Sequence, residues 1–119
     1  MGLTAFLVAA ARAIETHRDD SLAQDVYANT SCAPPRVRGL AGAHRAGPRR
    51  GRQPAVGRFA RYFGLRTRAL DDFLLRSVRT GPRQVVLLGA GLDTRAFRLD
   101  WPSQCAVFEI DRTGVLAFK

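Results

Sequence analysis

The chain has 119 residues, 46% apolar and 24% charged, which suffices for one small domain or part of a larger one. Its 19 basic and 10 acidic residues give a formal net charge of +9, a balance typical of proteins with polyanionic partners. No run approaches the roughly 18 apolar residues of a membrane-spanning helix, and two cysteines are too few for a disulfide framework, so we expect a cytoplasmic protein without a membrane partner.

Residues 1–30 form a segment that is predicted to be helical. Apolar side chains recur at three- and four-residue spacing and so share one face of a helix: Leu3, Phe6, Leu7, Ala10 and Ile14. Arg12 lies off this stripe, which predicts a solvated side chain. No Lys or Arg precedes the apolar run, so we do not expect a secretory signal.

Residues 31–58 lose the helical pattern. They contain four prolines, five glycines and seven arginines, but no acidic residue. The rest of the chain has 12 basic and 10 acidic residues, so the excess charge belongs to this segment. Because it cannot bury enough apolar surface to offset the entropy of ordering, we expect disorder. Its composition changes abruptly at both ends, and we hypothesise that it is translated out of frame from GC-rich DNA.

Regular structure is predicted again for residues 59–119. A helical apolar stripe comes first, formed by Leu65, Ala69, Leu70, Phe73, Leu74 and Val78. Gly81 and Pro82 end this helix. Gln84–Leu88 is then a short, mostly Val and Leu run, typical of a strand that is buried on both faces in a parallel sheet. Cys105–Ile110 is a second such run, so the predicted fold class is α/β.

The chemistry-bearing residues follow these two predicted strands. Gly89 and Gly91 come directly after the first, where the absence of a side chain lets a ligand approach the backbone. Asp111 ends the second, twenty residues after Gly91, a spacing that suits a carboxylate binding ribose hydroxyls. Thr94 replaces the third glycine of the dinucleotide fingerprint. The pattern predicts an adenosine-type cofactor; the alternatives are a ligand-free turn and a solvated strand end.

Two motifs carry a resemblance to a known family. Gly89–Leu99 (GAGLDTRAFRL) followed by Phe108–Asp111 (FEID) resembles the leucine carboxyl methyltransferase family, most closely its actinobacterial S-adenosylmethionine-dependent branch. Further matches precede the first strand or lie near the N-terminus: Leu65–Arg68, Asp71–Phe73 and Thr4–Glu15. The likeness covers about residues 3–28 and 59–119. It implies the N-terminal part of a Rossmann-like class I methyltransferase, with only the first two strands of the sheet.

The resemblance also implies a cofactor and the residues that bind it. The cofactor is S-adenosyl-L-methionine, with Arg66 holding the methionine carboxylate. Gly89 and Gly91 make room for the cofactor, and Asp111 takes the ribose hydroxyls. Arg12 is a looser match to a basic residue near the methionine end. The implied reaction is O-methyl transfer to the hydroxyl or carboxylate of a small molecule, for which no metal or enzyme nucleophile is required.

Other readings of the sequence remain open. The family's later strands are absent from these residues, so we expect a truncated and inactive form whose affinity for the cofactor is weak or absent. One alternative is a non-enzymatic remnant. Another is a basic nucleic-acid-binding module, because arginines gain affinity by releasing counterions from phosphates. Residues 31–58 lack the interleaved aromatic side chains that stack on bases, so we expect no specific nucleic-acid partner.

Overall fold

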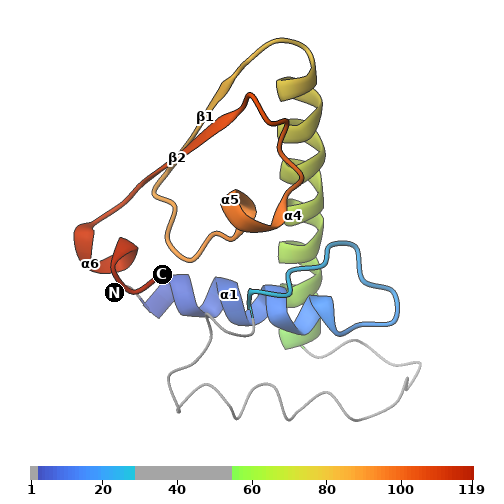
Figure 1. Ribbon diagram of the computed structural model, residues 1–119. Coiled ribbons are helices and arrows are strands. Elements are labelled where there is room, and N and C mark those ends of the chain that lie inside the picture. The colour runs from blue at the N-terminus through green and yellow to red at the C-terminus, as the bar shows by residue number, and fades with distance from the viewer. Residues whose placement is uncertain (1–2, 29–54) are drawn as a thin grey trace.

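The computed structural model describes residues 3–28 and 55–119 (Figure 1). Within them the elements follow in the order α1 (Leu3–Thr16), α4 (Ala55–Arg79), β1 (Gln84–Leu88), α5 (Arg95–Arg98), β2 (Ala106–Ile110) and α6 (Thr113–Leu116). The expected α/β composition is confirmed. None of the helices in these ranges is both long enough and apolar enough to span a bilayer. The disorder and the frame change hypothesised for residues 31–54 lie outside the described residues.

The two strands form a parallel pair in which Val86 faces Phe108 and Leu88 faces Ile110. The prediction that β1 is buried on both faces is wrong. Val85 is buried, whereas Val86 and Leu88 are 56% and 81% exposed. Successive side chains of a strand point to opposite faces of its sheet, and here only one face is covered by described residues. The second strand begins at Ala106, one residue later than predicted.

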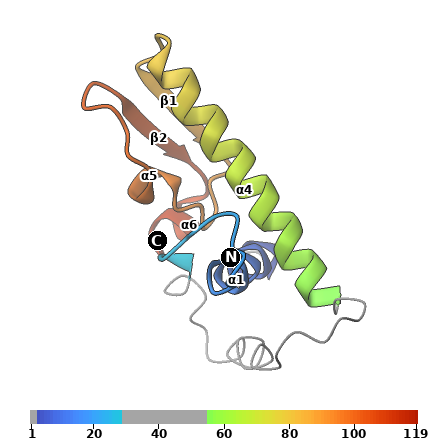
Figure 2. The ribbon, with the colours of Figure 1, turned by 90° about the vertical axis from the view of Figure 1, so that its right-hand side faces the viewer.

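The long helix α4 begins earlier than the sequence predicts. Residues 55–58 were assigned to the disordered segment, but they form its first turn. The buried residues of α4 recur every three or four positions from that turn to Asp71, with Val78 seven positions further on, and most are small: Gly57, Ala60, Gly64, Thr67, Asp71 and Val78. The two views show α1 crossing the N-terminal half of α4 (Figures 1 and 2), and Gly64 of this stripe lies against Glu15 of α1. Small side chains permit that close approach.

Each helix buries only part of its predicted apolar stripe, namely Ala10 in α1 and Val78 in α4. In α4, Leu65 and Phe73 are exposed. In α1, Leu7 is exposed and the helix instead buries alanines together with Arg12 and Glu15. Glu15 receives a hydrogen bond of 2.9 Å from Arg61 of α4. The facing sides of α1 and α4 therefore pack through small residues and ion pairs.

Candidate cofactor-binding site

A cavity of about 710 Å³ lies at the C-terminal ends of the two strands. Its walls come from the N-terminal half of α1, the middle of α4, the loop after β1 and the segment after β2. The predicted site residues all line it: Arg12, Arg66, Gly89, Gly91 and Asp111. Residues from four distant parts of the chain therefore meet around one space.

The loop after β1 exposes its backbone to the cavity. Gly89 and Gly91 have φ values of +63° and +53°, in the left-handed region that side chains disfavour. The Gly89 N–H donates to the Ile110 carbonyl at 2.8 Å, which ties the loop to the end of β2. A Cβ atom added to Gly89 would meet nothing within 4 Å, so this residue borders open space. A ligand can therefore approach the main chain here.

Asp111 closes the loop from the β2 side. Its Oδ2 accepts a hydrogen bond from the Gly91 N–H at 2.7 Å, and its Oδ1 accepts one from the Arg112 N–H at 2.6 Å. These two donors, Gly91 first, lower the pKa of the Asp111 carboxyl. Each oxygen of a carboxylate has a second acceptor position. Asp111 is thus a charged acceptor that fixes the loop and still has capacity for hydroxyl donors.

Arg66 lines the cavity from the exposed side of α4. Its guanidinium carbon lies 5.9 Å from the centre of the Phe63 ring, a cation–π distance. Among the residues that the structure describes, no carboxylate pairs with it. Arg66 is consequently a cation whose planar donor fork is available to an anionic ligand.

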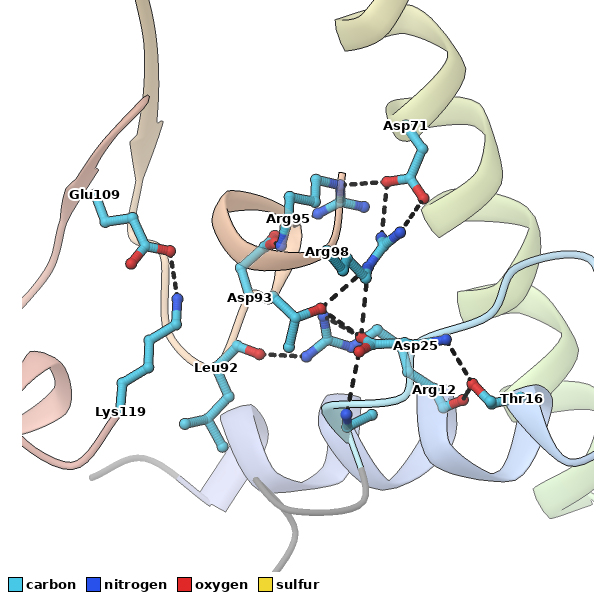
Figure 3. A network of polar contacts seen from close by, with 12 residues as sticks. Arg12, Thr16, Asp25, Asp71, Leu92, Asp93, Arg95, Arg98, Glu109 and Lys119 are labelled. Atoms are coloured by element: carbon cyan, nitrogen blue, oxygen red, sulfur yellow. Dashed lines mark hydrogen bonds and ion pairs between the residues drawn. The ribbon is translucent and has the colours of Figure 1, made fainter. Parts of the chain in front are cut away.

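Arg12 is buried, and the prediction that it is solvated is wrong. Its residue surface is only 5% exposed. One terminal nitrogen, Nη1, lies 3.2 Å from Asp25 Oδ2, and the other, Nη2, donates to the Leu92 carbonyl (Figure 3). Burial lowers the Arg12 pKa, and the nearby carboxylates of Asp25 and Asp93 oppose that effect. The pattern of α1 did not reveal this because both partners lie outside the helix, with Leu92 80 residues along the chain.

Sequence reasoning also missed a network of three arginines and three aspartates behind the loop (Figure 3). Asp71 is buried and receives hydrogen bonds from Arg95 Nε at 2.7 Å and Arg98 Nη2 at 2.8 Å. Asp93 Oδ1 accepts a hydrogen bond of 2.8 Å from the Arg95 N–H. The signal for Asp71 was its place on the small-residue stripe of α4.

Comparison with known proteins gives a family and several relatives. The sequence profile of the family described as "Leucine carboxyl methyltransferase" matches residues 5–119. A Streptomyces coelicolor protein is 68% identical over the whole of this chain and 40% of its own length. A Mycobacterium tuberculosis protein is 44% identical over the whole chain and 37% of its own length. Both are named "putative S-adenosyl-L-methionine-dependent methyltransferase". The chain thus spans about two fifths of these relatives.

Proposed function

The chain belongs to the leucine carboxyl methyltransferase family, and on that premise we propose that it forms the cofactor-binding part of a Rossmann-like methyltransferase. The proposed cofactor is S-adenosyl-L-methionine, which the names of the relatives support. One observation carries the proposal: the glycine loop, Asp111 and Arg66 line a single cavity. The sequence also allowed a ligand-free turn at the glycines and a solvated strand end at Asp111. Neither alternative accounts for these residues lining the same cavity.

The residues around the cavity fit such a cofactor. A volume of about 710 Å³ lies within the range of small-molecule sites. Asp111 would accept hydrogen bonds from ribose hydroxyls, and the bare backbone at Gly89 would allow close approach of the nucleoside. Arg66 would bind the carboxylate of the methionine moiety through its fork. The bound cofactor would supply an electrophilic methyl group on a sulfonium.

We propose that the acceptor is an oxygen atom, the hydroxyl or carboxylate of a small molecule in the cytoplasm. For a displacement of this kind, the protein contributes mainly by holding the two reactants close and correctly oriented. The described residues shape the cofactor side of that arrangement. With one sheet face exposed and only two strands described, we expect weak cofactor affinity and no turnover from these 119 residues.

Calorimetric titration with S-adenosyl-L-methionine tests the proposal. We expect saturable binding that Asp111→Ala weakens by about tenfold, since a charged acceptor is lost. Asp72→Ala is the matched control, because this carboxylate lies on the exposed side of α4 and pairs only with Arg68 within the described residues. A chain whose far-UV circular dichroism shows helix and sheet, yet which gives no saturable heat, would contradict the proposal.

A further inference from the structure

The donor fork of Arg12 is already occupied by the protein itself. Nη1 faces Asp25 and Nη2 donates to the carbonyl of Leu92, a residue of the cofactor loop. The third donor, Nε, has no partner among the described residues and is shielded from solvent by its surroundings. Each terminal nitrogen carries a second N–H, so a ligand carboxylate would have to share this fork with Asp25 and the Leu92 carbonyl. Arg66 faces no such competition.

Asp25 holds Arg12 and the loop at the same time. Its Oδ2 accepts a hydrogen bond of 2.7 Å from the Thr94 hydroxyl. Its own backbone N–H donates to Thr16 Oγ1 at 2.9 Å, which secures Asp25 against the end of α1. The carboxylate is 1% exposed, so it needs these cationic and hydroxyl partners to remain buried as an anion. Asp25 therefore couples α1 to the loop.

A second support for the loop comes from α4. Asp71 accepts a hydrogen bond of 2.7 Å from Nε of Arg95, the residue that immediately follows the loop. Arg98 Nε donates to Thr94 Oγ1 at 3.1 Å, while its terminal nitrogens bind Asp71. The three arginines and three aspartates of the network have balanced charges. Buried charges are tolerated when they are paired in this way. The loop is consequently held by both helices.

We propose that Arg12, held by Asp25, is a positioning residue that fixes the loop Gly89–Thr94 and is not a ligand for the methionine carboxylate. This inference rests on the proposed function and revises the role that the family resemblance implies for Arg12. Arg66 is then the cation that binds the carboxylate. The loop is preorganised from behind, so that its backbone has the correct shape before the cofactor arrives.

Two ligands distinguish positioning from direct binding. S-adenosylhomocysteine carries the amino-acid carboxylate, whereas 5′-methylthioadenosine lacks it. We expect Arg12→Gln to weaken both ligands equally, by about tenfold, because the nucleoside cradle is disturbed. Arg66→Gln should weaken only S-adenosylhomocysteine, and the exposed control Arg68→Gln neither. Loss confined to S-adenosylhomocysteine in Arg12→Gln would overturn the inference.

Amide hydrogen exchange tests the same inference without any ligand, so it remains decisive if the wild-type chain binds neither compound and the proposed function fails. We expect about tenfold faster exchange at the loop amides in Arg12→Gln, with residues 73–79 at the far end of α4 unchanged. Thr94→Val, a milder change that removes only the hydroxyl facing Asp25, should show a smaller effect of the same kind. Unchanged loop exchange, or equal acceleration throughout α4, would refute positioning.

Discussion

At Gly89 the effect of backbone conformation can be measured apart from the effect of side-chain contacts. The φ of +63° strains any side chain, yet an added Cβ would meet no atom within 4 Å. We therefore expect Gly89→Ala to lower the free energy of unfolding by about 1–2 kcal/mol through backbone strain alone. Urea denaturation measures this loss.

Gly114 provides the matched control for that substitution. It lies in α6, and an added Cβ would likewise meet nothing within 4 Å, but its φ is not positive. Gly114→Ala should raise the free energy of unfolding by about 0.5–1 kcal/mol, because alanine is favoured over glycine in helices. Changes of the same sign at both positions would show that the left-handed conformation of Gly89 is not required.

The carboxyl of Asp111 predicts a defined pH dependence. Its pKa in the folded chain lies below the ordinary value of 3.8, because the Gly91 and Arg112 N–H groups stabilise the charged form. A depressed folded pKa contributes stability that is complete above 3.8 and disappears as the pH falls through the folded value. The stability difference between wild type and Asp111→Asn should therefore be constant above that pH and shrink below it. Urea denaturation across the acid range checks this, and a difference that changes only at higher pH would contradict it.

The sequence predicted the site residues that directly follow a strand, but it did not predict the residues that hold the loop in place. Gly89, Gly91 and Asp111 follow apolar runs directly, and parallel strands bring their C-terminal ends together. The contacts of Arg12 with Leu92 and of Asp25 with Thr94 span 80 and 69 residues. No local periodicity encodes such partners, so the sequence favoured a solvated Arg12.

At the level of elements, the contact between α1 and α4 depends on the absence of a side chain at Gly64. A Cβ atom there would lie 2.5 Å from Glu15 Cγ and 2.6 Å from Glu15 Cδ. Glu15 is itself immobilised, since its Oε1 accepts from Arg61 and from the Leu22 N–H. Gly64→Ala should consequently lower the free energy of unfolding by about 1–2 kcal/mol, although alanine alone favours a helix.

A double-mutant cycle separates the clash from helix propensity. When Glu15→Ala removes the obstructing side chain, Gly64→Ala should become stabilising by up to about 1 kcal/mol. Thermal or urea denaturation of the four chains gives the coupling between the two positions. If Gly64→Ala destabilises equally with and without the Glu15 side chain, the packing explanation is wrong.

The helices also show why apolar periodicity misplaced the packing faces. It located the end of α4 before Gly81 correctly, but in the apolar stripe that it assigned to the core Val78 is buried whereas Leu65 and Phe73 are exposed. The buried stripe combines glycine, alanine, threonine and aspartate at the same spacing. Close helix contact and ion pairing select small and charged residues, which hydropathy does not count as core.

For the whole molecule, the hypothesis that residues 31–58 are translated out of frame stays a prediction. We expect the gene to contain two compensating frame changes bounding this arginine-rich segment, the second near the codons for residues 55–58, where α4 begins. Resequencing the locus checks this directly. A continuous reading frame in which neither change occurs would show that the composition is native.

The sheet leaves a continuous apolar face uncovered by the described residues. Val86 and Leu88 of β1 lie beside Phe108 and Ile110 of β2, and all four are about half or more exposed. Such a patch beside an open strand edge favours association. We therefore expect the 119-residue chain to self-associate as its concentration rises, measured by sedimentation velocity.

Charged residues on that face should suppress the association without unfolding the chain. Leu88→Glu combined with Ile110→Lys places opposite charges on directly paired positions, where they attract across the strands. Both side chains are exposed, so we expect a change of less than about 1 kcal/mol in the free energy of unfolding. The double variant should then sediment as a monomer at concentrations where the wild-type chain associates. Equal association of both chains would place the contact elsewhere, with the exposed stripe of α4 as the next surface to substitute.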